Sequence, residues 1–493
     1  MGNRRWWGLG VLILPVLLVS MDVSVLFLAM PQLTKDLDPS PTQSLWILDS
    51  YSFVIAGLLI TMGSLGDRVG RRRLLIGGAT VFGAGSLLAA FAATPAMLIA
   101  ARALMGFGGA TLLPSSLAII STMFDDTVER GRAIGVWTSA FAGGTAVGPI
   151  VGGVLLHHFW WGSVFLINVP VVAVLWLAVR LLPADARADD EEAPFDLLGV
   201  ILSVGGILGV VYAVKHLALT GVDPVPVVVG AVGIALLAAF ATHCSRSAHP
   251  LVDLRLLRTP SFAVAIVVTL AAMMSLAATT YLVNEYLQSI TGRDPLGAAL
   301  LGLPMAATVC AFSLGSARIV ARIGVRRAFI GALLVCALGM VVLQWTGVHD
   351  GLWAFLLGSA VAGVGYGTAF SLVSVVAVGS VPPERAGEAT GISETSFELG
   401  QALGLALLGS LAAVVFAHRY AQTSPAFRGT LREALDSAGG SSAVSDAAKS
   451  AYMSGVHVAL GTAAAILLVM AAVTAMVLPR DPGTAPSEGP ISR

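Results

Sequence analysis

The sequence predicts an all-α integral membrane protein: a bundle of fourteen transmembrane helices, in two six-helix halves with an inserted helix pair between them. Three observations lead to this fold class. The 493-residue chain is 56% hydrophobic and only 11% charged, whereas a soluble domain carries about 25% charged residues. Apolar runs of about 20 residues, long enough to cross a hydrocarbon core, recur along the chain. Finally, the early and late parts of the chain resemble each other.

The apolar runs are expected to be helices, because backbone groups facing lipid must satisfy their own hydrogen bonds. The first run follows Arg4 and Arg5 and is too long for a cleaved signal peptide, so we interpret it as a transmembrane helix. The fourteen expected spans are residues 9–30, 44–66, 74–93, 96–123, 132–156, 161–182, 196–216, 222–242, 261–287, 296–316, 326–346, 351–379, 387–417 and 454–478.

An internal repeat divides the chain. "DRVGRRRLLIGG" at 67–78 aligns with "ARIGVRRAFIGA" at 321–332, and "ERGRAIG" at 129–135 with "ERAGEATG" at 384–391. Two parallel halves with a site between them form a transporter architecture. The expected units are an N-terminal half (1–182), a cytoplasmic linker with the inserted pair (183–260), a C-terminal half (261–478) with a long outside loop at about 418–453, and a disordered cytoplasmic tail (479–493).

Charge placement predicts the orientation and excludes several function classes. Most arginines fall on one side of the predicted spans, which places both termini in the cytoplasm. The formal net charge of +0 gives no reason to expect a nucleic-acid partner. None of the three lysines follows a glycine, so a P-loop is absent, and the three cysteines have no metal-site spacing. We therefore expect no enzyme activity, no cofactor and no metal. Separately, we expect the protein to be a monomer in the membrane.

The turn "GSLGDRVGRRR" (63–73) combines glycines, an acid and several arginines. Gly63 and Gly70 permit close packing and a tight turn, and Asp67 could cap the positive end of a neighbouring helix. The following arginines could pair with acidic groups across the bundle; the alternative is that they only anchor the cytoplasmic side. These arginines are Arg68, Arg71 and Arg72.

This turn resembles the signature loop of the major facilitator superfamily, which implies that fold and a latch between the halves at the cytoplasmic face. The second copy has Ala321 in place of the aspartate, so we expect its latch to be degenerate.

The segment "GGTAVGPIVGG" (143–153) predicts a closely packed helix face. Gly144, Gly148, Gly152 and Gly153 recur at helical spacing, and Pro149 should kink the helix. The alternative is generic glycine packing. The segment resembles the antiporter motif of exporters in the superfamily, which is largely absent from its importers, and this resemblance implies export.

Several charged residues lie inside predicted spans, where such groups are costly and usually functional. Arg102 resembles the superfamily's arginine implicated in proton transfer; the alternative is a structural ion pair. Asp22, in "MDVSVLFLAMP", resembles the acid in the first helix of fourteen-helix drug:proton antiporters. Asp49 and Glu285 are further candidates, each nearer the outer end of its helix, and Asp49 could instead be a vestibule residue that never titrates.

Glu394 and Glu398 lie on one face of a predicted membrane helix. Burial disfavours their charged forms, and their mutual repulsion couples their titrations. A proton and a cationic ligand would then compete for them, which is the basis of antiport; the alternative is an ion pair with Arg102 or another helix. Rings that face the same cavity could add cation–π attraction, and the candidates are Tyr51, Trp137, Phe141, Tyr366 and Phe397.

Together, these features predict a proton-coupled multidrug efflux antiporter of the bacterial inner membrane, driven by the proton gradient. Its expected partners are protons, the lipid bilayer and lipophilic organic cations such as quaternary ammonium compounds and dyes. Three alternatives stay open: a narrow exporter of one antibiotic or metabolite, a proton-coupled importer, and a non-transporting membrane protein.

Overall fold

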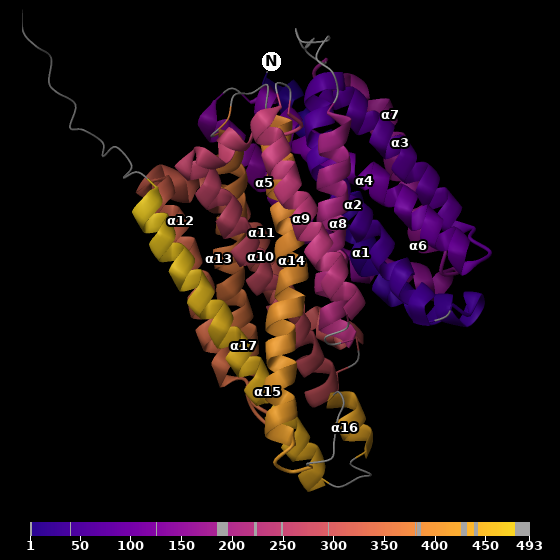
Figure 1. Ribbon diagram of the computed structural model, residues 1–493, viewed down its shortest axis with the longest axis vertical. Coiled ribbons are helices and arrows are strands. Elements are labelled where there is room, and N and C mark those ends of the chain that lie inside the picture. The colour runs from indigo at the N-terminus through magenta and orange to yellow at the C-terminus, as the bar shows by residue number, and fades with distance from the viewer. Residues whose placement is uncertain are drawn as a thin grey trace, which may run out of the picture.

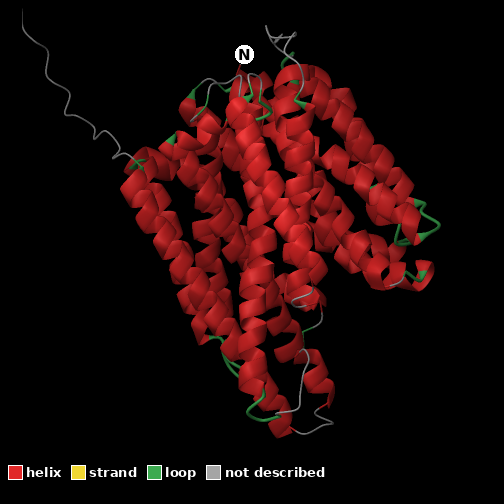
Figure 2. Cartoon of the chain, in the orientation of Figure 1, coloured by secondary structure: helices red, strands yellow, loops and turns green. Residues whose placement is uncertain are grey.

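The computed structural model describes residues 2–39, 41–124, 126–184, 196–220, 224–247, 250–293, 295–379, 381, 386–424, 431–437 and 442–478. Within these residues all regular structure is helical (Figure 2). The first part of the chain forms α1 (Gly2–Leu37), α2 (Pro41–Val69), α3 (Arg71–Ala90), α4 (Pro95–Met123), α5 (Thr127–His158), α6 (Ser163–Leu166), α7 (Asn168–Ala178) and η1 (Val179–Leu181).

The inserted pair and the last part of the chain follow. The inserted pair is α8 (Leu197–Thr220) and α9 (Pro224–Arg246). The last part forms η2 (Leu254–Arg258), α10 (Pro260–Glu285), η3 (Tyr286–Ile290), α11 (Pro295–Ile323), α12 (Val325–Val342), η4 (Leu343–Trp345), α13 (Leu352–Gly379), α14 (Ala386–Leu403), η6 (Gly404–Gly409), α15 (Ser410–Tyr420), α16 (Leu431–Ser437) and α17 (Ser442–Val477).

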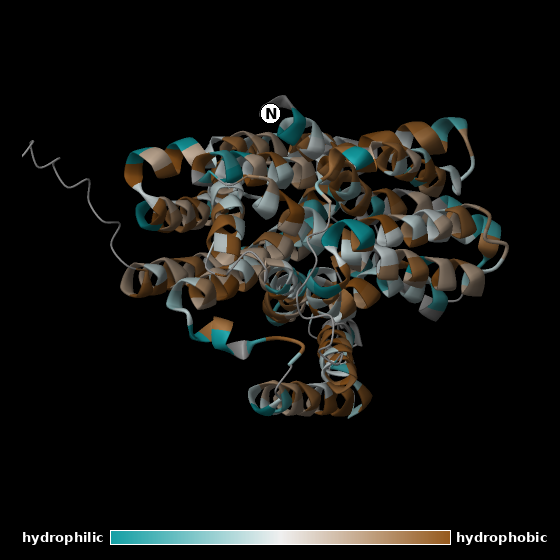
Figure 3. Cartoon of the chain, turned by 90° about the horizontal axis from the view of Figure 1, so that it is seen from above, coloured by the Kyte–Doolittle hydropathy of each residue, from teal (hydrophilic) through white to brown (hydrophobic). Residues whose placement is uncertain are grey.

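The number and composition of the helices confirm the predicted membrane bundle. Among the described residues, thirteen helices are long and apolar enough to cross a membrane, or fourteen if bent α5 counts as one span. The bend in α5, 40° between Thr145 and Ile150, contains Pro149, as expected for a proline inside a helix. Many large hydrophobic side chains, such as Leu177 and Met476, are exposed on the bundle, where lipid would solvate them, and hydrophobic residues occur on helices throughout the view from above (Figure 3).

Some boundaries differ from the sequence prediction. The expected sixth span is divided into α6, α7 and η1. Helix α17 begins at Ser442 instead of residue 454, and α16 occupies another part of the expected 418–453 loop. Helices α10 and α14 continue as the short π-helices η3 and η6. The tail at 479–493 and most of the 183–194 linker lie outside the described residues.

The buried side chains form two large clusters. One takes residues between Leu9 and Leu182, together with Val378 and Ala386, and the other takes residues between Phe240 and Leu478. In Figure 1 the indigo and purple helices α1–α7 lie beside the rose-to-yellow helices α10–α17. Helix α8 packs against α2 and α14, so the inserted pair contacts both parts.

Equivalent glycines form the turns of the two repeat copies. Gly70 joins α2 to α3 with φ +106°, and Gly324 joins α11 to α12 with φ +82°. Both backbones are in a region that residues with a Cβ rarely adopt. We call the end of the bundle that holds Gly2 and these two turns the N-face, and the opposite end the far face.

The two parts of the bundle contact each other near the N-face, where α2 packs against α14 and α5 against α11. The Oγ atoms of Ser139 and Ser313 donate hydrogen bonds to the carbonyl oxygens of Cys310 at 3.0 Å and Gly135 at 3.2 Å. These four residues belong to the halves of α5 and α11 that are nearer the N-face. The N-face is therefore the closed end of the interface between the two parts.

Candidate functional site

A buried ion pair joins α1 to α4. Asp22 accepts a hydrogen bond from the guanidinium of Arg102, and the two residues are only 6% and 1% exposed. Arg102 Nε also donates to the carbonyl oxygen of Ile47 at 3.3 Å, and its guanidinium carbon lies 4.5 Å from the centre of the Tyr51 ring. A buried charge is strongly destabilising once its partner is removed, so Asp22 and Arg102 form one structural unit.

The two glutamates of α14 lie on the other side of the interface. Glu394 and Glu398 are both half-buried, and their spacing places them on one side of the helix. The charge of Glu398 acts on Glu394 and also on the phenol of Tyr51. Glu398 therefore lies within electrostatic reach of the Tyr51–Arg102 contact in the first part of the chain. Arg102 is engaged by Asp22, so the alternative of an ion pair between Arg102 and these glutamates is not observed.

Aromatic rings form a continuous chain of contacts across the interface. Phe397 on α14 contacts Phe141 on α5 at 5.7 Å and Phe370 on α13 at 5.6 Å between ring centres. Phe141 stacks beside Trp137 at 6.4 Å, and Phe370 beside Tyr366 at 5.8 Å. Phe397 lies between the two glutamates in sequence, so the chain of rings crosses the interface on the same stretch of α14 that carries the carboxylates.

The predicted aromatic residues divide by exposure. Tyr51, Trp137 and Tyr366 are buried. Trp137 Nε1 donates to Ser116 Oγ at 3.0 Å, and the Tyr366 hydroxyl lies 2.7 Å from Ser275 Oγ. These three rings therefore pack helices together, and the half-buried rings near the glutamates are the phenylalanines of α5 and α14.

One predicted acid, Glu285, lies outside this group. Glu285 ends α10 toward the far face, where its carboxylate accepts a hydrogen bond from Ser289 Oγ at 2.9 Å. Its charge acts on Tyr281 and Tyr452, which are not part of the central group. Asp49 is half-buried on α2. The structure thus pairs Asp22 with Arg102 and places Glu394 and Glu398 on α14, which packs against α2 and α4. Glu285 belongs to a different cluster near the far face.

At the N-face, Asp67 binds the first turn of α14. Its carboxylate accepts hydrogen bonds from the backbone N–H groups of Gly387 at 3.2 Å and Glu388 at 3.0 Å, and from Arg71 Nε at 2.9 Å. Helix N-termini favour anions because their first N–H groups lack intrahelical partners. A Cβ at Gly63 would collide with the carbonyl oxygen of Gly387. We call this arrangement the α2–α14 latch; Arg68 and Arg72 are half-buried beside it.

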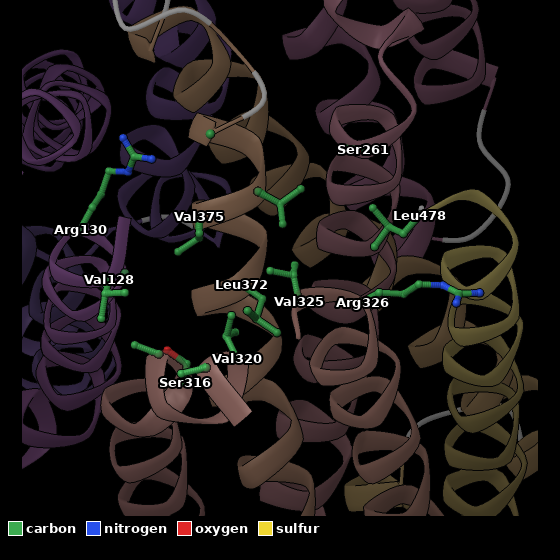
Figure 4. A pocket seen from close by; sticks show the side chains of 15 residues that line it. Val128, Arg130, Ser261, Ser316, Val320, Val325, Arg326, Leu372, Val375 and Leu478 are labelled. Atoms are coloured by element: carbon green, nitrogen blue, oxygen red, sulfur yellow. The ribbon is translucent and has the colours of Figure 1, made fainter. Parts of the chain in front are cut away.

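The second repeat copy has a pocket at the equivalent place. Ala321 occupies the position of Asp67, and beside it a pocket of about 440 Å³ opens among α5, α11, α12 and α13 (Figure 4). Gly131 from the start of α5 lines the pocket, and Arg130 and Arg326 lie on opposite sides of it. The two parts of the bundle therefore meet here without the carboxylate that joins α2 to α14.

We expect Ala321→Asp to favour closure of the N-face, because the new carboxylate would lie near the first turn of α5. A charge at a helix N-terminus contributes about 0.3–1 kcal/mol, so the closed state should gain roughly two- to fivefold in population and transport should slow. The measurement is the efflux rate at equal protein level. Ala321→Asn is the uncharged control, and an Asp variant as fast as the parent protein would contradict the expectation.

The glycines of α5 pack against α1. A Cβ at Gly152 would lie 2.9 Å from Val25, and one at Gly144 would also collide with α1. Gly148 is buried on the same helix. Gly153 is exposed, and a Cβ there would meet nothing within 4 Å. The face that packs closely against α1 therefore includes Gly144 and Gly152, with Gly148 buried between them and Gly153 outside it.

These two environments provide a matched pair of substitutions. Gly144→Ala should destabilise the bundle by about 1–3 kcal/mol, the usual effect of overpacking, and should reduce transport. Gly153→Ala should be neutral or slightly stabilising, because alanine favours helix over glycine by about 1 kcal/mol. Thermal unfolding in detergent measures both variants, and equal midpoints would show that the α1–α5 contact is not tight.

A polar cluster that the sequence analysis missed lies where the inserted pair meets the N-face. Asp196 accepts hydrogen bonds from the N–H groups of Gly199 at 2.8 Å and Leu251 at 2.9 Å, and its carboxylate lies 2.8 Å from His243 Nε2. Burial alone would raise the pKa of Asp196, but these hydrogen bonds outweigh it and hold the pKa below the ordinary 3.8. Asp196, His243 and Leu251 are too far apart in the chain for their spacing to indicate the cluster.

The direction of this shift predicts a pH dependence. Because the folded-state pKa is depressed, Asp196 stabilises the fold at pH values above 3.8, and this contribution is lost as the pH falls through the folded-state pKa. Asp196→Asn should therefore lower the thermal midpoint at pH 7, and the difference from the parent protein should shrink toward pH 3. A constant difference across this range would show that the charge does not contribute.

Comparisons with known proteins show the family to which the chain belongs. The Major Facilitator Superfamily profile matches residues 12–405 and 265–493. The chain is 36% identical to the multidrug efflux pump LfrA of Mycolicibacterium smegmatis, over 97% of each chain. It is 34% identical to the methyl viologen resistance protein SmvA of Salmonella typhimurium, over 95% of this chain and 97% of that one.

Among solved structures, the fold is similar to that of the human organic anion transporter MFSD10, with a TM-score of 0.67 and 14% identity, over 95% of this chain and 99% of that one. At this identity the likeness concerns the fold alone. The family profile and the two efflux relatives, which match nearly the whole chain, decide the assignment: the protein belongs to the Major Facilitator Superfamily and is a multi-pass membrane transporter, not an enzyme.

Proposed function

We propose that this protein is a proton-coupled antiporter that exports lipophilic organic cations across the inner membrane of a bacterium. The observation that carries the proposal is the pair Glu394 and Glu398, half-buried on the same helix as Phe397, whose ring contacts Phe141 across the interface between the two parts of the bundle. Carboxylates attract a cation, and ring faces add cation–π attraction when water is excluded. A lipophilic cation matches both features.

The same carboxylates can hold either a proton or the cation. In a poorly solvated site the ionised form is disfavoured unless a positive charge lies beside it, so protonation releases the cation and deprotonation restores the site. The Asp22–Arg102 ion pair is a second group that takes part in the proton exchange. Tyr51 connects it to the glutamates, because its ring contacts Arg102 and its phenol is within electrostatic range of Glu398. Each charge that moves through the membrane potential contributes about 2.3 kcal/mol per 100 mV, so no cofactor is required.

The arginine distribution favours a cytoplasmic N-face with both termini inside the cell. In that orientation the closed N-face corresponds to an outward-facing state. The α2–α14 latch and the α5–α11 contact are then the moving contacts, whereas the glycine face of α5 packs against α1 within the first part. One chain contains both parts of the bundle, so a monomer is sufficient.

The names of the relatives support the substrate class. LfrA is named as a multidrug efflux pump and SmvA as a methyl viologen resistance protein. Methyl viologen carries two quaternary nitrogens on aromatic rings, which is the chemistry that paired carboxylates beside phenylalanines would bind.

Ethidium efflux tests the proposal. Cells that express the protein should export ethidium faster than cells with an empty vector, and a protonophore should abolish the difference. Export that persists without the gradient would overturn proton coupling. No ethidium or methyl viologen export, together with export of a single antibiotic, would favour the narrow-exporter alternative.

A further inference from the structure

A chain of hydrogen bonds connects the inserted pair α8–α9 to the α2–α14 latch. The connecting segment is residues 250–253, between α9 and η2. The N–H of Asp253 donates to the carboxylate of Glu388, and the N–H of Glu388 itself donates to Asp67 at 3.0 Å. Two residues before Asp253, the N–H of Leu251 donates to Asp196 at 2.9 Å. Glu388 is 8% exposed, so a buried carboxylate joins the segment to the first turn of α14, at the α2–α14 latch.

Asp196 extends the connection to both inserted helices. It caps the start of α8 through the N–H of Gly199 at 2.8 Å and lies 2.8 Å from His243 Nε2 near the end of α9. A displacement of the segment at 250–253 would therefore pull on α8 and α9 together.

The contact between α8 and α2 is of a different kind. Phe53 and Ala56 of α2 pack against Ile207 and Val211 of α8 in a small apolar cluster. Apolar contacts have no preferred direction, so one helix can shift along the other at little cost. Hydrogen bonds to a carboxylate are directional and stronger. Of these two attachments, the hydrogen bond at Glu388 is therefore the one that fixes the position of the inserted pair relative to α14.

We propose that Glu388 is a positioning residue that makes the inserted pair move with α14 when the α2–α14 latch opens, while α8 slides along α2. Transporters of this architecture rock one part of the bundle against the other, so α14 must leave Asp67 in each cycle. The Asp253–Glu388 contact does not cross that opening surface and persists while the latch breaks. In this structure α8 packs against both α2 and α14 (Figure 1), and with this movement the inserted pair would stay beside the α2–α14 contact throughout the cycle.

Native Cys244 reports on this connection. Cys244 is 6% exposed near the end of α9, and its thiol lies against the backbone of Leu251 and Val252. In a Cys310→Ala/Cys336→Ala background, Cys244 is the remaining thiol. Glu388→Ala should raise its maleimide labelling rate about tenfold, the effect of losing one hydrogen bond to a charged group. Glu388→Gln keeps an acceptor oxygen and should stay near the parent rate, and Glu129→Ala is the control at the same face.

Transport provides the second measurement. Glu388→Ala should reduce the maximal efflux rate severalfold without changing ethidium binding, and Glu388→Gln should restore the rate. Unchanged Cys244 labelling in Glu388→Ala would overturn the proposal, as would equal loss in the Ala and Gln variants. If Glu388→Ala does not accumulate, Asp196→Ala is the alternative variant, because Asp196 is at the other end of the hydrogen-bond connection. It should also raise the labelling rate of Cys244, and an unchanged rate would overturn the proposal.

A crosslink tests the sliding of α8 directly. In a cysteine-free background, joining Phe53→Cys to Ile207→Cys should stop transport, because it ties α8 to α2. Full transport with this crosslink in place would contradict the proposed movement. The labelling experiment needs neither substrate nor gradient, so its outcome is separate from whether the protein exports cations.

Discussion

Glu398→Gln is expected to abolish gradient-driven export while leaving the fold intact. Glutamine has nearly the same shape as glutamate but cannot exchange a proton, and Glu398 is the carboxylate that acts on both Glu394 and Tyr51. Without it α14 lacks one of the two carboxylates that we propose exchange a proton for the cation. Ethidium efflux should fall to the level of the empty vector, whereas yield and thermal midpoint should match the parent protein.

The matched control is Glu285→Gln, which removes a half-buried carboxylate near the far face that belongs to a different cluster. This variant should retain most of the efflux. Wild-type efflux in Glu398→Gln would remove Glu398 from the mechanism. Equal losses in both variants would show that export needs total negative charge and not this particular position.

The second large effect is expected at the buried ion pair. Asp22→Asn leaves Arg102 buried without its counter-charge, and breaking such a pair costs about 3–5 kcal/mol. The variant should therefore show a much lower thermal midpoint and poor yield. Arg102→Met should be similarly unstable, because it leaves the carboxylate of Asp22 uncompensated in the same environment.

The double variant Asp22→Asn/Arg102→Met separates stability from transport. Removing both charges should recover most of the midpoint, because neither charge is left alone. Efflux should stay absent if the pair takes part in proton exchange. A double variant that is both stable and active would show that the ion pair is only structural, and single variants with normal midpoints would contradict its tight coupling.

The sequence was sufficient to predict the fold because membrane helices leave a strong local signal. Long apolar runs, repeated turns at Gly70 and Gly324, and the break at Pro149 are all properties of neighbouring residues. The differences arose where that signal is weak. The start of α17 at Ser442 is polar enough to look like a loop, yet it continues an apolar helix.

The site was only partly predictable, because its pairings join residues that are distant in the chain. A charge in an apolar run indicates that a partner of opposite charge is needed, but it does not identify that partner. Arg102 could therefore have been assigned to either glutamate instead of Asp22. Phe370 carried no charge and no motif, although it completes the chain of rings. Glu388 lies in a short polar stretch, and nothing local indicated that its carboxylate reaches the N–H of Asp253.

The length of α17 has a practical consequence. Its 36 residues make a rod of about 54 Å, whereas the hydrocarbon layer is only about 30 Å thick. Part of the rod must stand clear of the bilayer at the end that also carries α16. Images of a small membrane protein are hard to align in electron microscopy. The projecting part of α17 is a rigid epitope for antibody fragments, and it extends beyond the detergent belt, where it would help to align the images.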